Sequence, residues 1–257
     1  MYKIYFIVFA LVIGSCKSDN SKKSNENISM NDSLQVLKKF YYPIDSLEEG
    51  LVYEYVDDST GFTYDYWLYK TVRDDAGDKF LIGTGYDAFF EQRYFSREWI
   101  VANGTVQKDY LFMQTDSSTG KSAIRPATIV SDVLYPFSPV KDSSMAYRFR
   151  IKFSLLPDTA LQYDLTKDRL FDSYSTYNFN GKELKTAIFK INEHMEAADR
   201  TKDGGHWDLK SELKEIYAEG IGLVFKERKS KVLNSRIRLK SIMSIEEFQK
   251  KQKSKNN

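Results

Sequence analysis

The distribution of apolar and polar residues divides the 257-residue chain into distinct stretches. An unbroken apolar run from Ile4 to Ile13 is followed by an almost entirely polar stretch, 17–33. From Leu51 to Met243, short runs rich in Tyr, Phe, Trp, Val and Thr alternate with turn residues. Apolar residues in these runs recur with a period closer to two than to 3.6, which predicts strands rather than helices.

The clearest expected strand covers 147–155, where large apolar residues at odd positions alternate with Arg148 and Arg150. Such alternation is typical of a strand with one buried and one solvated face. Asn103-Gly104 and Asn180-Gly181 are strong hairpin signals, because both residue types tolerate positive φ. Further strands are expected at 51–56, 62–72, 79–86, 89–102, 105–115, 173–180, 185–194, 214–229 and 234–243. Consecutive hairpins predict a mainly β domain built as a single antiparallel meander.

Short helices are expected on both sides of this domain. Leu37 and Phe40 fit a helix that must end before Pro43, and Ser244 with Glu247 fits a capping box for a terminal helix. The predicted organisation is a signal peptide at 1–15, a lipidated cysteine and flexible tether at 16–33, the β domain at 34–243, and a short helix with a basic tail at 244–257.

The first sixteen residues have the order of an export signal. Lys3 supplies the positive charge, Ile4–Ile13 forms the apolar region, and Gly14 and Ser15 are small. The apolar run is too short for a membrane-spanning helix, which needs about 20 residues. Ile13 to Cys16 resembles the lipobox of bacterial lipoproteins. This resemblance implies a diacylglycerol on the Cys16 sulfur, cleavage before Cys16, and an N-acyl group on the new terminus.

Cys16 is the single cysteine of the chain, and lipidation would remove an unpaired thiol from an oxidising compartment. Two or three acyl chains hold a protein on a membrane far more firmly than one. Cys16 is followed by Lys17 and not by the aspartate that resembles an inner-membrane retention signal, so an outer-membrane location is expected. Lys17-Ser18-Asp19 resembles in part a surface-export signal of Bacteroidetes-like lipoproteins. Whether the chain faces the periplasm or the cell surface stays open.

The formal net charge is +2, but Lys and Arg are concentrated after Lys226. A basic end can contact anionic lipid headgroups or nucleic acid, or it can be a solvated strand edge with a frayed tail. The basic residues alternate with Ile237 and Leu239 as in an ordinary strand, and an exported lipoprotein rarely meets nucleic acid. The basic end is therefore expected to be a solvated strand edge with a frayed tail. The membrane is an expected partner through the lipid anchor, and nucleic acid is not a partner.

Catalytic and metal-binding patterns are weak. His194 and His206 are the only histidines, and their spacing fits no zinc template. Gly120-Lys121-Ser122 ends like a phosphate-binding loop but lacks the first glycine and the surrounding βαβ unit. No metal, no catalytic residue and no cofactor other than the lipid on Cys16 are expected, so the chain is predicted not to be an enzyme.

Aromatic residues are concentrated in the first half of the domain, with sixteen between Tyr53 and Phe112. They could line a cavity for an apolar ligand, as in ligand-holding barrels, or simply fill a thick β core. The residues expected to bind such a ligand are Tyr64, Tyr66, Trp67, Tyr69, Phe89, Phe90 and Trp99.

The segment 216–224, some 35 residues after the Asn180-Gly181 turn, resembles a closing strand of exported bacterial proteins. Many of these are similar to periplasmic half-barrels of the lipoprotein-carrier type, in which a curved sheet wraps an apolar cavity. The resemblance implies a curved sheet or half-barrel, with Gly220 and Gly222 on one strand face permitting a bend or a close backbone approach. The leading hypothesis is noncatalytic binding of a hydrophobic ligand or envelope partner. An enzyme acting on envelope glycans or lipids, and a purely structural envelope component, are the alternatives.

Overall fold

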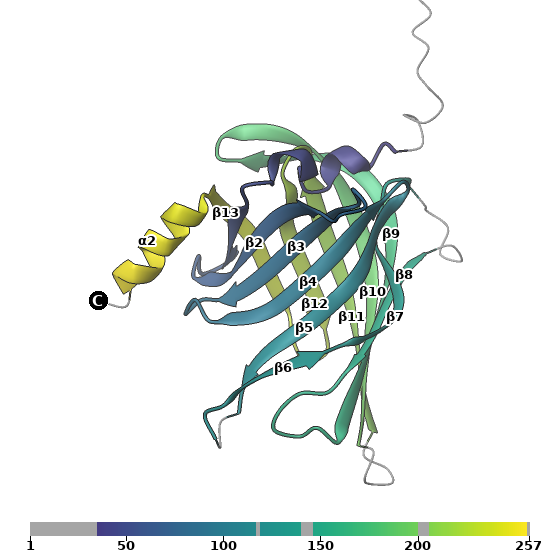
Figure 1. Ribbon diagram of the computed structural model, residues 1–257. Coiled ribbons are helices and arrows are strands. Elements are labelled where there is room, and N and C mark those ends of the chain that lie inside the picture. Colours follow the sequence, from purple (N-terminus) through teal and green to yellow (C-terminus); the bar gives the residue numbers. More distant parts are fainter. Residues whose placement is uncertain (1–34, 117–118, 140–145, 200–205, 256–257) are drawn as a thin grey trace, which may run out of the picture.

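The computed structural model describes residues 35–116, 119–139, 146–199 and 206–255, and these form one antiparallel sheet with a helix packed outside it (Figure 1). The strands are β1 (Leu51–Asp57), β2 (Thr63–Arg73), β3 (Lys79–Asp87), β4 (Gln92–Val101), β5 (Gly104–Thr115), β6 (Ser122–Pro126), β7 (Thr128–Pro136), β8 (Tyr147–Phe153), β9 (Leu161–Phe179), β10 (Lys182–Asp199), β11 (His206–Ala218), β12 (Gly222–Ser230) and β13 (Ser235–Met243).

Twelve of these strands close into a barrel. Each pairs with its neighbour in sequence, except that β5 pairs with β7 at its start and with the short side strand β6 at its end. Closure comes from β1, which pairs with β2 on one side and with β13 on the other. In that closing ladder Val52 lies opposite Met243 and Asp57 opposite Ile237.

The expected half-barrel is therefore wrong in one respect: the sheet is closed. An open sheet leaves two rows of unpaired backbone groups, and full closure removes both edges. The β1–β13 ladder joins residues 180 or more positions apart, and no local pattern in either strand indicates its partner. The predicted mainly β, antiparallel meander is otherwise observed.

One predicted strand is in fact a hairpin. The segment 214–229 divides into the end of β11 and most of β12, with a turn at 219–221 in which Gly220 has φ +73°. Gly220 therefore lies in a turn and Gly222 at a strand start, rather than together on one strand face. β6 and β7 have no counterpart among the predicted strands, and β9 and β10 are longer than expected.

Residues 35–50 lie across one end of the barrel and contain the 3₁₀ turns η1 (Lys38–Phe40) and η2 (Ile44–Ser46) in place of the expected helix (Figure 1). This segment is called the plug. Its apolar side chains are buried against the inner ends of the strands, and the set comprises Leu37, Phe40, Tyr41, Tyr42, Ile44 and Leu47. The Thr71 amide donates to the Leu47 carbonyl at 2.9 Å, which ties the plug to β2.

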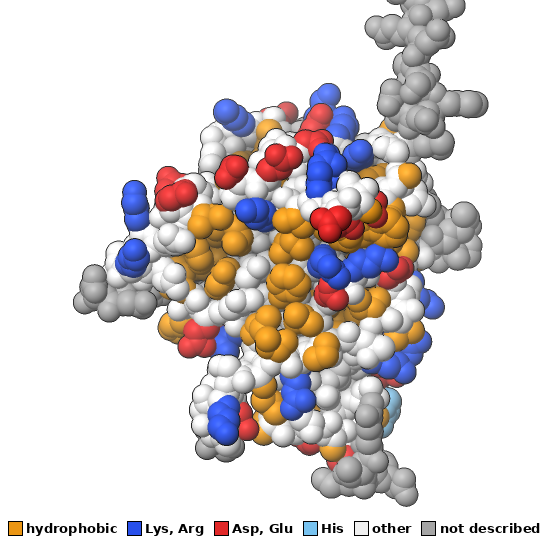
Figure 2. All heavy atoms as spheres, in the orientation of Figure 1, with side chains coloured by type: hydrophobic (Ala, Val, Ile, Leu, Met, Phe, Trp, Pro, Cys, Tyr) orange, Lys and Arg blue, Asp and Glu red, His pale blue; other side chains and the backbone are white. Residues whose placement is uncertain are grey.

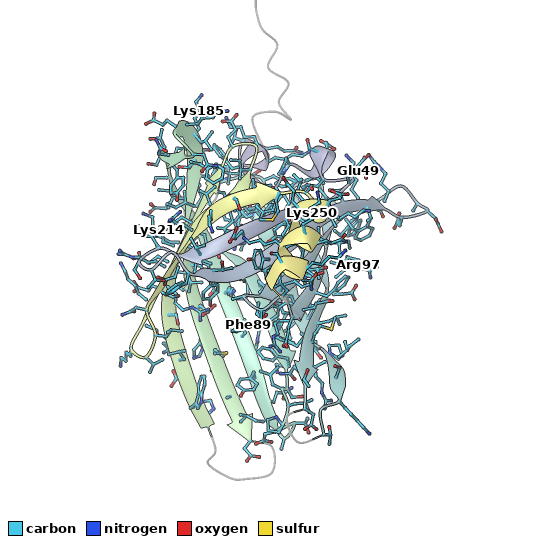
Figure 3. The ribbon with its side chains drawn as sticks, turned by 90° about the vertical axis from the view of Figure 1, so that its left-hand side faces the viewer. Glu49, Phe89, Arg97, Lys185, Lys214 and Lys250 are labelled. Atoms are coloured by element: carbon cyan, nitrogen blue, oxygen red, sulfur yellow. The ribbon has the colours of Figure 1, made fainter. Side chains whose placement is uncertain are left out.

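The helix α2 (Ile245–Lys255) packs on the outside of the barrel, with Lys250 labelled on it in Figure 3. The expected capping box is present: the Ser244 amide donates to the Glu247 carboxylate at 2.8 Å, and the Glu247 amide donates to Ser244 Oγ at 3.2 Å. Phe248 is buried with Val52, Tyr66 and Phe90. No helix within the described residues has the length and apolar character needed to cross a membrane.

The outer face of the first strands is also partly apolar, and Figure 2 shows such side chains gathered over β2 to β5. Phe80 and Trp99 lie opposite each other on β3 and β4. Arg97 lies over the Phe80 ring and Lys108 over the Trp99 ring, at 5.5 and 4.6 Å from the centroids. The aromatic density of this half is therefore divided between the two faces of the barrel wall.

Candidate functional site: the barrel lumen

The inside of the barrel contains a cavity of about 510 Å³. Barrel diameter grows with strand number, and about eight strands already enclose a space that side chains just fill. Twelve strands enclose a larger space than the inward-pointing side chains of this barrel fill. Tyr41 and Tyr42 of the plug line the cavity at one end. Thr71 on β2 contacts the plug, and Tyr64 lies seven residues earlier on the same strand. Tyr64 also lines the cavity and is 53% exposed, so the mouth of the barrel lies at the end opposite the plug.

One wall of the lumen is aromatic. Trp67 stacks on Tyr69 and on Tyr94, with ring centroids 5.9 and 6.0 Å apart and interplanar angles of 13° and 6°. Gly85 on β3 makes room for this stack, because a Cβ there would lie 3.0 Å from the Trp67 ring. Tyr55, Tyr110 and Phe112 continue this wall.

An aliphatic and aromatic wall adjoins it on β8 and β9. Phe149, Ile151 and Phe153 alternate along β8 and are buried, as their spacing in the sequence predicts. The Phe153 ring lies 4.5 Å from that of Phe112, which joins this wall to the aromatic one. Leu165 on β9 extends it toward the charged wall.

The remaining wall, formed by β9 to β12, carries a cluster of charged side chains. Glu193 lies 3.4 Å from Lys167 Nζ and 2.8 Å from Arg228 Nη2. Glu215 lies 2.7 Å from Arg169 Nη2 and 3.9 Å from Lys226 Nζ, and accepts a hydrogen bond from Tyr217 at 3.0 Å. This cluster, called the charged wall, consists of Lys167, Arg169, Glu193, Glu215, Lys226 and Arg228.

The charges within the charged wall favour the ionised form of Glu215 and disfavour the protonated form of Lys167. Burial raises the pKa of Glu215, but the charges of Arg169, Lys226 and Lys167 outweigh it and lower that pKa to about 2. Burial and the nearby Lys226 lower the pKa of Lys167 to about 8, despite the attraction of Glu193 and Glu215. Each of the two carboxylates in the charged wall is thus shared by two basic side chains, so the bases of this wall outnumber its acids.

Two more carboxylates line the lumen from the aromatic side. Burial raises the pKa of Asp65 to about 6, and the Trp67 indole donates to it at 3.1 Å. Burial also raises the pKa of Glu98, which accepts hydrogen bonds from Tyr41 at 2.5 Å and Thr105 at 3.2 Å. Both thus have neutral hydrogen-bond donors, and burial favours their uncharged forms.

The seven predicted ligand-binding aromatics are separated by the barrel wall. Tyr64, Trp67 and Tyr69 line the lumen. Tyr66 and Phe90 are buried under α2, with rings stacked at 5.0 Å. Phe89 is 75% exposed in the turn after β3, and Trp99 lies on the outer face. Cys16 and the tether 16–33 lie outside the described residues, so lipidation there stays a prediction.

The sequence pattern did not predict the charged wall, because charged side chains occupy both faces of its strands. On β9, Asp164 and Asp168 pair outside with arginines of β8, while Lys167 and Arg169 point into the lumen. Period-two alternation is therefore absent from the sequence here. The cross-strand pairing of Lys167 with Glu193 and of Glu215 with Lys226 appears only once the register is known.

Two other features are weaker candidates for a site. A hollow of about 880 Å³ lies between the plug and the β9–β10 hairpin, but it is more open than the lumen and is lined mainly by the plug itself. His194 Nε2 lies 3.5 Å from Asp208 and 3.7 Å from Glu196. Within the described ranges, no group of three or more His, Cys, Asp or Glu side chains is arranged to hold a metal ion.

Comparison with one solved structure supports the fold. A crystal structure from Bacteroides fragilis NCTC 9343, described as a candidate exported protein with a YmcC-like fold, matches 80% of this chain and 99% of its own. The TM-score is 0.50 and the identity 14%. A candidate lipoprotein from Parabacteroides distasonis ATCC 8503 matches 79% of this chain and 97% of its own, with a TM-score of 0.47 and 12% identity. No protein-family model matches the chain, and no curated protein matches it significantly.

Proposed function

We propose that this chain is an exported lipoprotein, held on the outer membrane by acyl groups on Cys16, whose barrel binds a hydrophobic small molecule without converting it. The observation that carries the binding function is the cavity of about 510 Å³, lined by Trp67, Tyr69 and Phe112. Its size lies within the usual range for small-molecule sites. The fold of a protein described as exported, together with the lipobox resemblance, supports the location.

The barrel architecture suits noncatalytic binding. The plug buries one end, so a ligand would enter at the mouth near Tyr64 and Leu233, which are 53% and 52% exposed. Stacked aromatic rings offer a preformed apolar surface whose side chains lose little entropy when a ligand binds. Trp67 and Phe153 would contact an apolar body from two sides of the lumen.

The test is binding of a neutral fluorescent probe, N-phenyl-1-naphthylamine, to the Cys16→Ser chain, in which no acyl chain of the protein competes for the lumen. We expect saturable binding with enhanced fluorescence. Met195→Trp introduces a large ring into the lumen and should weaken binding about tenfold or more. Lys190→Trp, on the outer face of the same strand, should leave it unchanged.

Absence of saturable binding, or equal affinity of the Met195→Trp chain, would contradict the proposed function and favour a structural role. Circular dichroism of both variants checks that the barrel is retained.

A further inference from the structure

The lumen combines an apolar surface with one wall on which basic side chains outnumber acidic ones. In the charged wall four basic side chains share two carboxylates, Glu193 and Glu215. Isolated charges are costly in an environment of low polarity unless each has a partner of opposite sign. A barrel that needed these groups only for stability would be expected to balance them.

The pairing within the charged wall is unequal. Arg169 and Arg228 lie 2.7 and 2.8 Å from their carboxylates, whereas Lys167 and Lys226 lie at 3.4 and 3.9 Å. The lysine side chains are 24% and 26% exposed and line the cavity. The arginines thus satisfy the acids, and the two ammonium groups remain available to the lumen.

Apolar and basic groups lie next to each other along the strands. Leu165 and Lys167 are two residues apart on β9, and Leu223 and Lys226 both line the cavity from β12. On the facing wall, Asp65 and Glu98 are hydrogen-bonded to neutral donors. The whole lumen is therefore lined by four bases and four acids, but burial raises the pKa of both Asp65 and Glu98 and so favours their uncharged forms, and neither acid pairs with Lys167 or Lys226.

We infer that the ligand of this lumen is an anionic amphiphile, with an apolar body against the aromatic walls and a carboxylate, phosphate or sulfonate group against Lys167 and Lys226. This inference rests on the proposed function, because it specifies the ligand of the same cavity. Lys167 and Lys226 lie 3.4 and 3.9 Å from their carboxylates, and a bound anion would give both ammonium groups a closer partner of opposite charge. Such charge-assisted hydrogen bonds are about twice as strong as neutral ones.

The test compares two probes with the same arylamine skeleton: neutral N-phenyl-1-naphthylamine and anionic 1-anilinonaphthalene-8-sulfonate. In a Lys167→Met/Lys226→Met chain Glu193 keeps Arg228 and Glu215 keeps Arg169, so neither acid is left unpaired and folding should persist. We expect the double variant to weaken the anionic probe at least about tenfold and to change the neutral probe by less than about twofold.

Lys214→Met is the matched control, because Lys214 lies on the same sheet but projects from the outer side of the barrel (Figure 3). It should leave the affinities of both probes unchanged. The single substitution Lys226→Arg, which keeps the positive charge, should retain binding of the anionic probe. Equal loss of both probes, or no selective loss of the anionic one, would overturn the anionic amphiphile while leaving lumen binding intact. Binding of neither probe to the parent chain would overturn the proposed function itself.

Discussion

At the residue scale, Asp65 is an acid of the lumen whose burial costs stability at neutral pH. Burial raises its pKa to about 6, against an opposing hydrogen bond from Trp67 and the charge of Lys226. One carboxylate oxygen, Oδ1, is buried without a hydrogen-bond partner. Since the folded-state pKa of Asp65 lies above the ordinary 3.8, the contribution of its protonated form to folding stability is complete below about pH 4 and is lost as pH rises through 6.

The pKa shift of Glu215 has the opposite sign, so the contribution of its ionised form to folding stability is present above pH 4.5 and is lost as pH falls toward 2.

We therefore expect Asp65→Asn to stabilise the protein at pH 7.5 by on the order of 1–3 kcal/mol. An amide oxygen can still accept from the Trp67 indole, so the hydrogen bond is retained. The gain should diminish steadily as pH is lowered from 6 to 4, because Asp65 is then protonated in the folded parent chain. Chemical denaturation of both chains across this range measures it. A gain that does not vary with pH would show that the charge of Asp65 is not its cause.

At the element scale, the plug and the β11–β12 hairpin hold each other in place. The Tyr42 ring lies over Gly222, where a Cβ would come within 2.5 Å of Tyr42 Cδ1. Tyr42 also donates to the Tyr69 hydroxyl at 2.8 Å, and the Tyr53 hydroxyl donates to the Ile221 carbonyl at 3.1 Å. The close approach at Gly222 therefore determines how deeply the plug enters the barrel end.

Gly222 and Gly220 provide a matched pair for testing this contact. Both have positive φ, +102° and +73°, so alanine is strained at either position. Only at Gly222 does alanine also displace an aromatic ring, since nothing lies within 4 Å of a Cβ at Gly220. We expect Gly222→Ala to lower the free energy of unfolding by about 1–3 kcal/mol more than Gly220→Ala. Urea denaturation measures both losses, and equal losses would contradict the role given to the Tyr42 contact.

At the scale of the whole molecule, the described chain begins at the plugged end of the barrel, where Gln35 donates to the Ala102 carbonyl at 2.7 Å (Figure 1). The mouth near Tyr64 lies at the other end of the lumen. A tether attached at the plug would thus join the barrel to its anchor without crossing the mouth. This arrangement is compatible with a ligand entering while the protein is held on a membrane.

The anchor itself is tested at Cys16. In the native host, Cys16→Ser should abolish metabolic labelling with a fatty-acid analogue and release any cleaved protein from the membrane fraction, because no sulfur remains to carry the diacylglycerol. Ser15→Ala, which keeps a small residue before the cysteine, should retain labelling. Unchanged labelling of the Cys16→Ser chain would contradict the lipoprotein assignment.

Much of the secondary structure could be predicted from short stretches of the sequence. Alternation on β8 indicated which side of the strand is buried, and Ser244 with Glu247 indicated where α2 begins, since both features depend on residues a few positions apart. Segments with charges on both faces, such as β9, gave weaker signals, and β6 and β7 were not expected. The aromatic density correctly pointed to large side chains in β2 and β4 but not to the face on which each lies.

By itself, then, the sequence determined the strand-rich meander and the terminal helix, and it predicts the signal with Cys16, because each is a pattern of neighbouring residues. Only the tertiary structure decided that β1 pairs with β13, that Trp67 faces inward while Trp99 faces outward, and that four basic side chains meet two acids inside the barrel. These outcomes depend on register and closure between distant strands. A shift of one residue in register would reverse the facing of every side chain on a strand, and no local pattern specifies which strand is its partner.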